Sequence, residues 1–454
     1  QMVCKMSLLQ CAILAAVVQQ SSAFISMPLP INTRFAPSTP LFSQRASCML
    51  IKIAAVDKLP HDSEWYLTQI LNAWSKNQED IVQTDLEKMS SVPGSNSKIL
   101  LKREDRQHGF SFHLRGATNL LSELEPDELV AGLITASSGN AAIALALAAN
   151  NIGVRKAIKV PILAVVPCDT SDIKMRMLRQ NGAEVIQHGD TICDAVLRAQ
   201  EIAEQRGLLL VGASPSHDPY LIAGHGTAAL EILQQHRAPL DAIFVPVGSA
   251  RLLAGIAVYA ARISPSTRII GVQPRPRHTD TCYRTGNAEG EKKVSQEVAL
   301  CLETSLGVES LRLCQAYVHE VLQVDDDEIA EAIQQVYSET RSVVEPVGAL
   351  ALAGARQWLT AAPPTSGAPR TVVAVASGGN VDLVQVAFWL QRHRQERTQF
   401  MMESLLRHQM APVPAGPALL LHAHRRIGFA KHLKQAHLRP QTPLHTCSLA
   451  NLHS

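Results

Sequence analysis

Short runs of apolar residues, many of them β-branched, alternate with longer alanine- and leucine-rich segments between residues 57 and 396. Each short run is apolar at almost every position, which is typical of strands that are buried on both faces of a parallel sheet. The predicted strands have the sequences KILLK, LITAS, ILAVVP, EVIQH, LLLVGA, AIFVPVG, RIIGVQP, EVLQVD and RTVVAVAS.

The segments between these strands have the periodicity of helices. Examples begin at Asn140, Thr170 and Thr191, with the sequences NAAIALALAANN, TSDIKMRMLRQNGA and TICDAVLRAQEIAEQRG. The last of them places apolar residues at i, i+3, i+4 and i+7 and ends at Gly207, as a capped helix does. This alternation of strands and helices predicts an α/β fold in which helices cover both faces of parallel sheets.

Three loops of small and polar residues directly follow predicted strands. They are TASSGN, PVGSAR and ASGGN, at residues 135–140, 246–251 and 376–380. Ligands of open α/β sheets bind at the carboxyl ends of the strands, where loops meet helix N-termini. We therefore expect the chemistry of the protein in these loops.

The composition is that of an ordinary globular protein, with 46% hydrophobic and 18% charged residues among 454. The formal net charge of +2 gives no indication of a nucleic-acid-binding protein. The nine cysteines form no CxxC pair, so neither a zinc site nor a disulfide framework is indicated. A reducing compartment is the default expectation.

The two ends differ from the rest of the chain. Lys5 precedes an apolar run of signal-peptide length, and no acidic residue occurs before Asp57. Residues 1–56 resemble the two-part presequence of algae with secondary plastids, which predicts the plastid stroma; the alternative is a secretory signal with a linker. Residues 397–454 are basic and rich in histidine, and we expect a poorly ordered tail without a regulatory domain or metal site.

Six segments occur in the order found in the biosynthetic threonine dehydratases, which are pyridoxal 5'-phosphate-dependent enzymes of fold type II. They are KREDRQHGFSFHLRGATNLL, GLITASSGNAAIALA, HDPYLIAGHGTAALEIL, IFVPVGSARLLAGIAV, EPVGALALAGA and VASGGN. This resemblance implies a large and a small α/β domain within residues 57–396, both with parallel-type sheets, and the cofactor in a cleft between them. It also implies deamination of L-threonine to 2-oxobutanoate and ammonia, or of L-serine, and assembly into oligomers.

The chain departs from this family at the residue that holds the cofactor covalently. The family pattern is Ser-Phe-Lys-x-Arg-Gly-Ala, in which the lysine forms the Schiff base and moves the α-proton, and here that position is His113. Imidazole has no primary amine and cannot form the Schiff base. It retains the capacity to act as a general base with a pKa near neutrality. The alternative is that His113 only fills the vacated space.

A second departure lies in the phosphate-binding loop, where the family has a run of four glycines. This chain has Gly248, Ser249, Ala250 and Arg251, followed by Leu252. Side chains there are expected to crowd the phosphate, and a positive φ is costly for any residue but glycine. The alternative is that the Arg251 guanidinium holds the phosphate.

Other positions of the family site are kept. The resemblance assigns Phe112 and Asn140 to the cofactor ring and Ser377 to the pyridine nitrogen, and it places Arg115 and Glu345 with His113 in the catalytic set. The alternative for Arg115 and Glu345 is that they hold the fold together.

Three functions are compatible with this pattern. The first is a dehydratase-like pseudoenzyme, impaired in catalysis and assembled with an active paralogue. The second is an active ammonia-lyase with non-standard cofactor anchoring. The third is a non-catalytic subunit that binds an amino acid or a phosphate. None of them involves nucleic acid, or a membrane in the mature protein.

Overall fold

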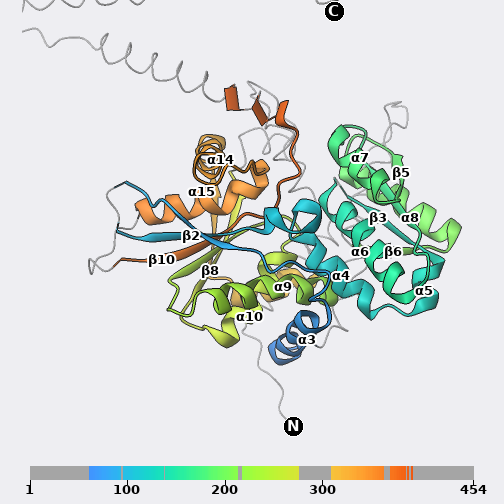
Figure 1. Ribbon diagram of the computed structural model, residues 1–454, viewed down its shortest axis with the longest axis horizontal. Coiled ribbons are helices and arrows are strands. Elements are labelled where there is room, and N and C mark those ends of the chain that lie inside the picture. Colours follow the sequence, from blue (N-terminus) through green and yellow to red (C-terminus); the bar gives the residue numbers. More distant parts are fainter. Residues whose placement is uncertain are drawn as a thin grey trace, which may run out of the picture.

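The computed structural model describes most of the chain between residues 61 and 391 (Figure 1). The described residues are 61–93, 96–137, 139–212, 217–275, 308–361, 369–384, 386–387 and 390–391. The predicted presequence (1–56) and tail (397–454) lie outside them. Within the described ranges, no helix has the length and apolar character needed to cross a membrane.

The larger of two sheets has six strands in the order β1-β2-β10-β7-β8-β9. The strands are β1 (Leu86–Met89), β2 (Lys98–Lys102), β10 (Thr371–Val375), β7 (Ala242–Pro246), β8 (Arg268–Pro274) and β9 (Glu320–Val324). All neighbours are parallel except β1, which pairs with β2 in the antiparallel sense.

Helices cover both faces of this sheet. The helices on one face are α3 (Ser63–Lys76), α9 (Asp218–Gln235), α10 (Arg251–Ile263) and α13 (Val308–Tyr317), and those on the other are α14 (Asp326–Thr340) and α15 (Pro346–Ala361). Strand β7 shows why its residues are all apolar: Ile243 and Val245 pack toward α9 and α10, whereas Ala242 and Phe244 pack toward α14 and α15.

The smaller sheet has four parallel strands in the order β5-β4-β3-β6. These strands are β5 (Glu184–Gln187), β4 (Ile162–Val166), β3 (Leu133–Ala136) and β6 (Leu209–Val211). One face packs against α4 (His113–Glu123), α5 (Pro126–Ala131), α6 (Asn140–Lys156) and α7 (Asp172–Gln180), and the other against α8 (Ile192–Arg206). In Figure 1 the larger sheet lies on the left, the smaller on the right, and α4 between them.

The predicted α/β fold class is confirmed, and so are the predicted strands and the capped helix. Helix α8 begins with a capping box between Thr191 and Asp194 and ends at Gly207, whose φ is 66°. Strand β1 was not predicted, because its sequence LEKM carries two charged residues and has no apolar run. It is an edge strand, where charged side chains are common.

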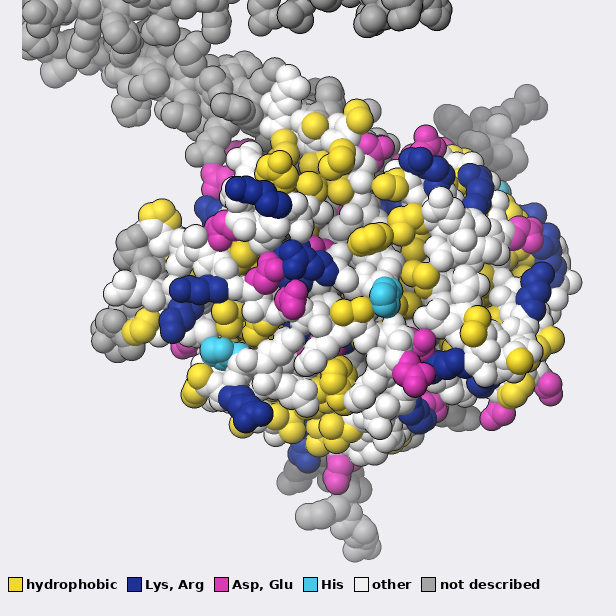
Figure 2. Space-filling view, in the orientation of Figure 1, with side chains coloured by type: hydrophobic (Ala, Val, Ile, Leu, Met, Phe, Trp, Pro, Cys, Tyr) yellow, Lys and Arg dark blue, Asp and Glu magenta, His cyan; other side chains and the backbone are white. Residues whose placement is uncertain are grey.

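The surface agrees with the near-neutral net charge. Figure 2 shows basic and acidic side chains interspersed over the visible face, without a large patch of one sign. The formal net charge of the whole chain is +2.

Candidate functional site

Three segments that are distant in sequence meet beside the carboxyl end of β10. The backbone N–H of Phe112 donates to the Ser377 carbonyl oxygen over 3.2 Å, and Ser111 forms an isolated bridge with Gly378. The Glu345 N–H donates to the Gly378 carbonyl oxygen over 3.1 Å. A Cβ on Gly378 would lie 2.4 Å from Glu345 Oε1, so any larger residue at position 378 would displace the Glu345 carboxylate. The structure thus brings the predicted site residues Phe112, Glu345 and Ser377 together.

His113 is the first residue of α4, and its ring is enclosed by other rings. It stacks on Phe112 with 3.9 Å between ring centroids and meets the His225 ring edge-on at 6.2 Å. Burial, together with the positive charges of Arg251 and Lys174, lowers the pKa of His113 to about 3. Its Nδ1 forms no hydrogen bond with the described residues. The imidazole is therefore neutral at ordinary pH.

This environment bears on the role of His113. The sequence left two interpretations of His113, a general base with a pKa near neutrality or a side chain that only fills the vacated space, and burial lowers the pKa to about 3, which favours the second. Proton transfer is most effective when the pKa of the base lies near the working pH. A neutral imidazole that is so hard to protonate is a weak acceptor for a substrate proton.

The same pKa shift predicts a pH-dependent stability. The folded pKa of His113 lies below its unfolded value of about 6.5, so between these values the unfolded state binds more protons. The free energy of unfolding is therefore expected to fall as the pH drops from 6.5 toward 3, with His113 contributing up to ~1.4 kcal/mol per pH unit. Urea unfolding of wild type and His113→Gln between pH 4 and 7 measures this. Equal pH slopes would contradict the prediction.

Glu345 joins the large sheet's helices to those of the small sheet. Its Oε1 accepts a hydrogen bond from Asn140 Nδ2 over 2.6 Å, and its Oε2 forms an ion pair with Lys174 Nζ over 3.0 Å. Asn140 Oδ1 accepts from Asn380 Nδ2 over 3.0 Å. Asn140 begins α6 and Lys174 lies in α7, so one carboxylate at the start of α15 links two helices of the smaller unit. Lys174 was not predicted from the sequence.

The Ser377 hydroxyl forms only one long hydrogen bond with the described residues. Ser377 is only 5% exposed, and its Oγ lies 3.5 Å from the Val347 carbonyl oxygen, at the limit of a hydrogen bond. A buried hydroxyl is usually fully hydrogen-bonded. The Ser377 side chain therefore retains capacity to contact a polar group of a ligand.

The loop after β7 keeps a left-handed backbone without the glycine that favours it. Ala250 has φ 62° and ψ 4°, directly before α10. The left-handed conformation that was expected to be costly in this loop therefore occurs at Ala250, and not at Gly248 or Ser249. Leu252 is 3% exposed and packs in the core, so its side chain is not available to a ligand.

Replacement of Ala250 by glycine is expected to stabilise the protein. The left-handed conformation costs an L-residue roughly 1–2 kcal/mol, part of which is offset by the greater chain entropy of glycine. We expect the free energy of unfolding to rise by about 0.5–1 kcal/mol in urea unfolding. The matched control is Ala254→Gly in the interior of α10, which is expected to destabilise by about 1 kcal/mol. A destabilising effect of both changes would contradict this account.

Arg251 is engaged by protein groups. Its Nε donates to Asp218 Oδ1 over 3.0 Å, and Nη2 donates to the Gly212 carbonyl oxygen over 2.7 Å. The Arg251 side chain is 17% exposed, and its charge contributes to the lowered pKa of His113. A phosphate clamp formed by Arg251 would have to compete with Asp218 for these donors.

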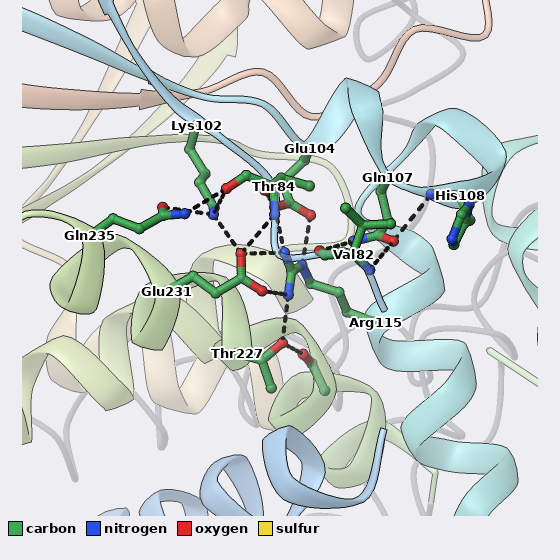
Figure 3. A network of polar contacts seen from close by, with 11 residues as sticks. Val82, Thr84, Lys102, Glu104, Gln107, His108, Arg115, Thr227, Glu231 and Gln235 are labelled. Atoms are coloured by element: carbon green, nitrogen blue, oxygen red, sulfur yellow. Dashed lines mark hydrogen bonds and ion pairs between the residues drawn. The ribbon is translucent and has the colours of Figure 1, made fainter. Parts of the chain in front are cut away.

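Arg115 lies in a buried ion network rather than beside His113 (Figure 3). Residues two apart on a helix point to different sides. All five guanidinium N–H donors are used: two contact Glu104, two contact Glu231 and one contacts the Thr227 hydroxyl. The predicted catalytic role for Arg115 is therefore corrected, because no donor remains for a substrate. The alternative of a structural role is supported.

Lys102 completes this network and was missed by the sequence interpretation. Its ammonium contacts Glu231 Oε2, the Thr84 carbonyl oxygen and Gln235 Oε1, and its side chain is fully buried. Burial lowers the pKa of Lys102 despite its two carboxylate neighbours, Glu104 and Glu231. The sequence feature that could have indicated it is a lysine at the end of an otherwise apolar strand, KILLK, where a buried charge needs a partner.

A cavity of about 370 Å³ opens beside Arg115 and Thr227, next to the end of α3.

The residues fit the non-covalent contacts of pyridoxal phosphate and do not fit its covalent attachment at position 113. Ala250 adopts a positive φ directly before the N-terminus of α10, where helix N–H groups are suited to an anion, and the Ser377 hydroxyl has only one long hydrogen bond within the described part of the chain. Position 113 presents a buried imidazole without an amine.

Comparison with known proteins agrees with this geometry. Residues 78–378 match the family model "Pyridoxal-phosphate dependent enzyme". A biosynthetic L-threonine dehydratase of Burkholderia multivorans is 39% identical over 72% of this chain and 63% of its own length, and that of Escherichia coli is 38% identical over 61% and 52%. The chain thus spans between about half and two thirds of these relatives.

Solved structures give the same result. The processed form of threonine deaminase isoform 2 from Solanum lycopersicum has a TM-score of 0.61 and 31% identity, covering 72% of this chain and 93% of that one. Maize serine racemase has a TM-score of 0.60 and 26% identity, covering 73% and 98%. The chain belongs to the pyridoxal-phosphate-dependent enzymes of fold type II, in the threonine dehydratase family.

Proposed function

We propose that this chain is a threonine dehydratase-like protein of amino-acid metabolism in which the deamination of L-threonine is strongly impaired. The observation that carries the proposal is His113, which stands in the place of the family's lysine. It has no primary amine, and its pKa of about 3 makes it a poor base.

The remaining residues support binding better than turnover. Pyridoxal phosphate, when bound, supplies an electron sink for the substrate's α-carbon. The Ser377 hydroxyl and the loop at Ala250 are suited to hold its polar groups, and Asn140 is fixed by Glu345 and Asn380. Neither of the two roles of the missing lysine, bonding the cofactor and moving the α-proton, has an effective replacement at position 113.

Threonine and serine are the substrates to test, because the relatives are named for reactions of these amino acids. The purified full chain is assayed for 2-oxobutanoate and pyruvate with saturating pyridoxal phosphate, beside the Burkholderia enzyme as the active standard. We expect a rate at least about 1,000-fold below that standard, since a positioned base alone contributes 100- to 10,000-fold. A rate within tenfold of it would overturn the proposal.

A further inference from the structure

Lys174 places an amine beside the residues that meet at this site. Its Nζ lies 3.0 Å from Glu345 Oε2, and its side chain is 16% exposed. The other oxygen of the same carboxylate accepts a hydrogen bond from Asn140, so the Lys174 amine and the Asn140 amide bind the two oxygens of one carboxylate. After burial and Arg251, the positive charge of Lys174 also contributes to the low pKa of His113, so the ammonium lies within electrostatic range of that ring.

Packing fixes the Lys174 side chain in this position. A Cβ on Gly139, which has φ 139°, would lie 2.3 Å from Lys174 Cδ and 3.1 Å from Cγ. The lysine stem therefore lies directly across the residue before α6. With the stem in this place, the amine at its end lies within hydrogen-bond distance of Glu345 Oε2.

The ammonium of Lys102, in contrast, is not accessible to a ligand. Lys102 is fully buried and is tied to Glu231, Thr84 and Gln235 in the ion network. Among the lysines that the structure describes, Lys174 is the one with a recorded bond to Glu345.

We propose that Lys174 captures the aldehyde of pyridoxal phosphate in this chain. The ammonium of Lys174 loses one proton to solvent, and the neutral amine adds to the aldehyde carbon. The aldehyde oxygen then leaves as water, and a carbon–nitrogen double bond joins Nζ to that carbon. The step consumes no oxidant or reductant. It rests on the proposed function only in taking pyridoxal phosphate as the cofactor, and it retains the cofactor without restoring a base at position 113.

The test is a spectrum followed by peptide mapping of the full chain. The protein is mixed with one equivalent of pyridoxal phosphate, reduced with borohydride, dialysed and digested. We expect a visible band that is lost on reduction, and a phosphopyridoxyl adduct on the peptide that contains Lys174. Lys174→Arg, which keeps the charge opposite Glu345, is expected to lose the band and the adduct. The control, Lys159→Arg at an exposed position, keeps both.

The outcomes separate this proposal from the impaired function. If the wild-type chain carries the adduct on other lysines, or carries no adduct, the proposed role of Lys174 is overturned. This outcome is read from the wild-type chain alone, so it does not depend on whether a variant folds. Such a result leaves the impairment at His113 untouched. Rapid threonine turnover together with an adduct at Lys174 would overturn the impairment and keep the inference.

Discussion

Replacement of Arg115 by methionine is expected to lower the free energy of unfolding by about 3–5 kcal/mol, the usual cost of removing one partner from a buried ion pair. The variant leaves the buried carboxylates of Glu104 and Glu231 with Lys102 as the remaining cation of the network. Urea or thermal unfolding of the two proteins measures the difference.

A matched control separates the buried network from charge loss in general. Arg198 forms an exposed ion pair with Glu201, with side chains 37% and 59% exposed. Arg198→Met is expected to change stability by no more than about 1 kcal/mol. Equal losses in the two variants would show that the network around Arg115 does not hold the fold together.

Replacement of His113 by lysine is expected to raise the rate of threonine deamination by at least about 100-fold over the wild type. The variant restores a primary amine at the start of α4. That amine would lie near Arg251 and Lys174, whose positive charges already act on His113, and like charges lower the pKa of a lysine. A neutral amine of this kind is both a nucleophile and a base. The assay is 2-oxobutanoate formation with saturating pyridoxal phosphate.

The control for this gain is His113→Arg. It introduces a long cationic side chain that is not deprotonated and does not form the covalent bond. We expect it to remain as slow as the wild type. If the lysine variant were no faster than the arginine variant, position 113 would not be what limits the chain.

The fold was largely predictable because its strands are buried on both faces. Runs such as ILAVV in β4 and AIFVP in β7 are buried at every position, so the apolar pattern alone marks them. Strand β1 was not predicted, because it lies at the sheet edge and two of the four residues in its sequence LEKM are charged. An edge strand forms because it hydrogen-bonds to its neighbouring strand and not because it is buried on both faces. Such pairing leaves no local pattern of apolar residues in the sequence.

The candidate site was predictable as a set of loops but not in its chemistry. Phe112 and Ser377 lie together because they follow β2 and β10, neighbouring parallel strands whose carboxyl ends share one edge of the sheet, and Glu345 joins them from the segment between α14 and α15. The pKa of His113 is lowered first by burial and then by the charges of Arg251 and Lys174, which are distant in sequence. The role of Arg115 depends on carboxylates from β2's end and from α9. Such charges meet only in the folded chain.

The most direct test of the central claim is the exchange of the α-proton of L-threonine in deuterium oxide. Nuclear magnetic resonance follows the loss of this proton in the presence of the wild-type chain and saturating pyridoxal phosphate, with free pyridoxal phosphate as the reference. Because position 113 offers neither an amine nor an effective base, the account predicts exchange no faster than with the free cofactor. Exchange at the rate of an active dehydratase would contradict it.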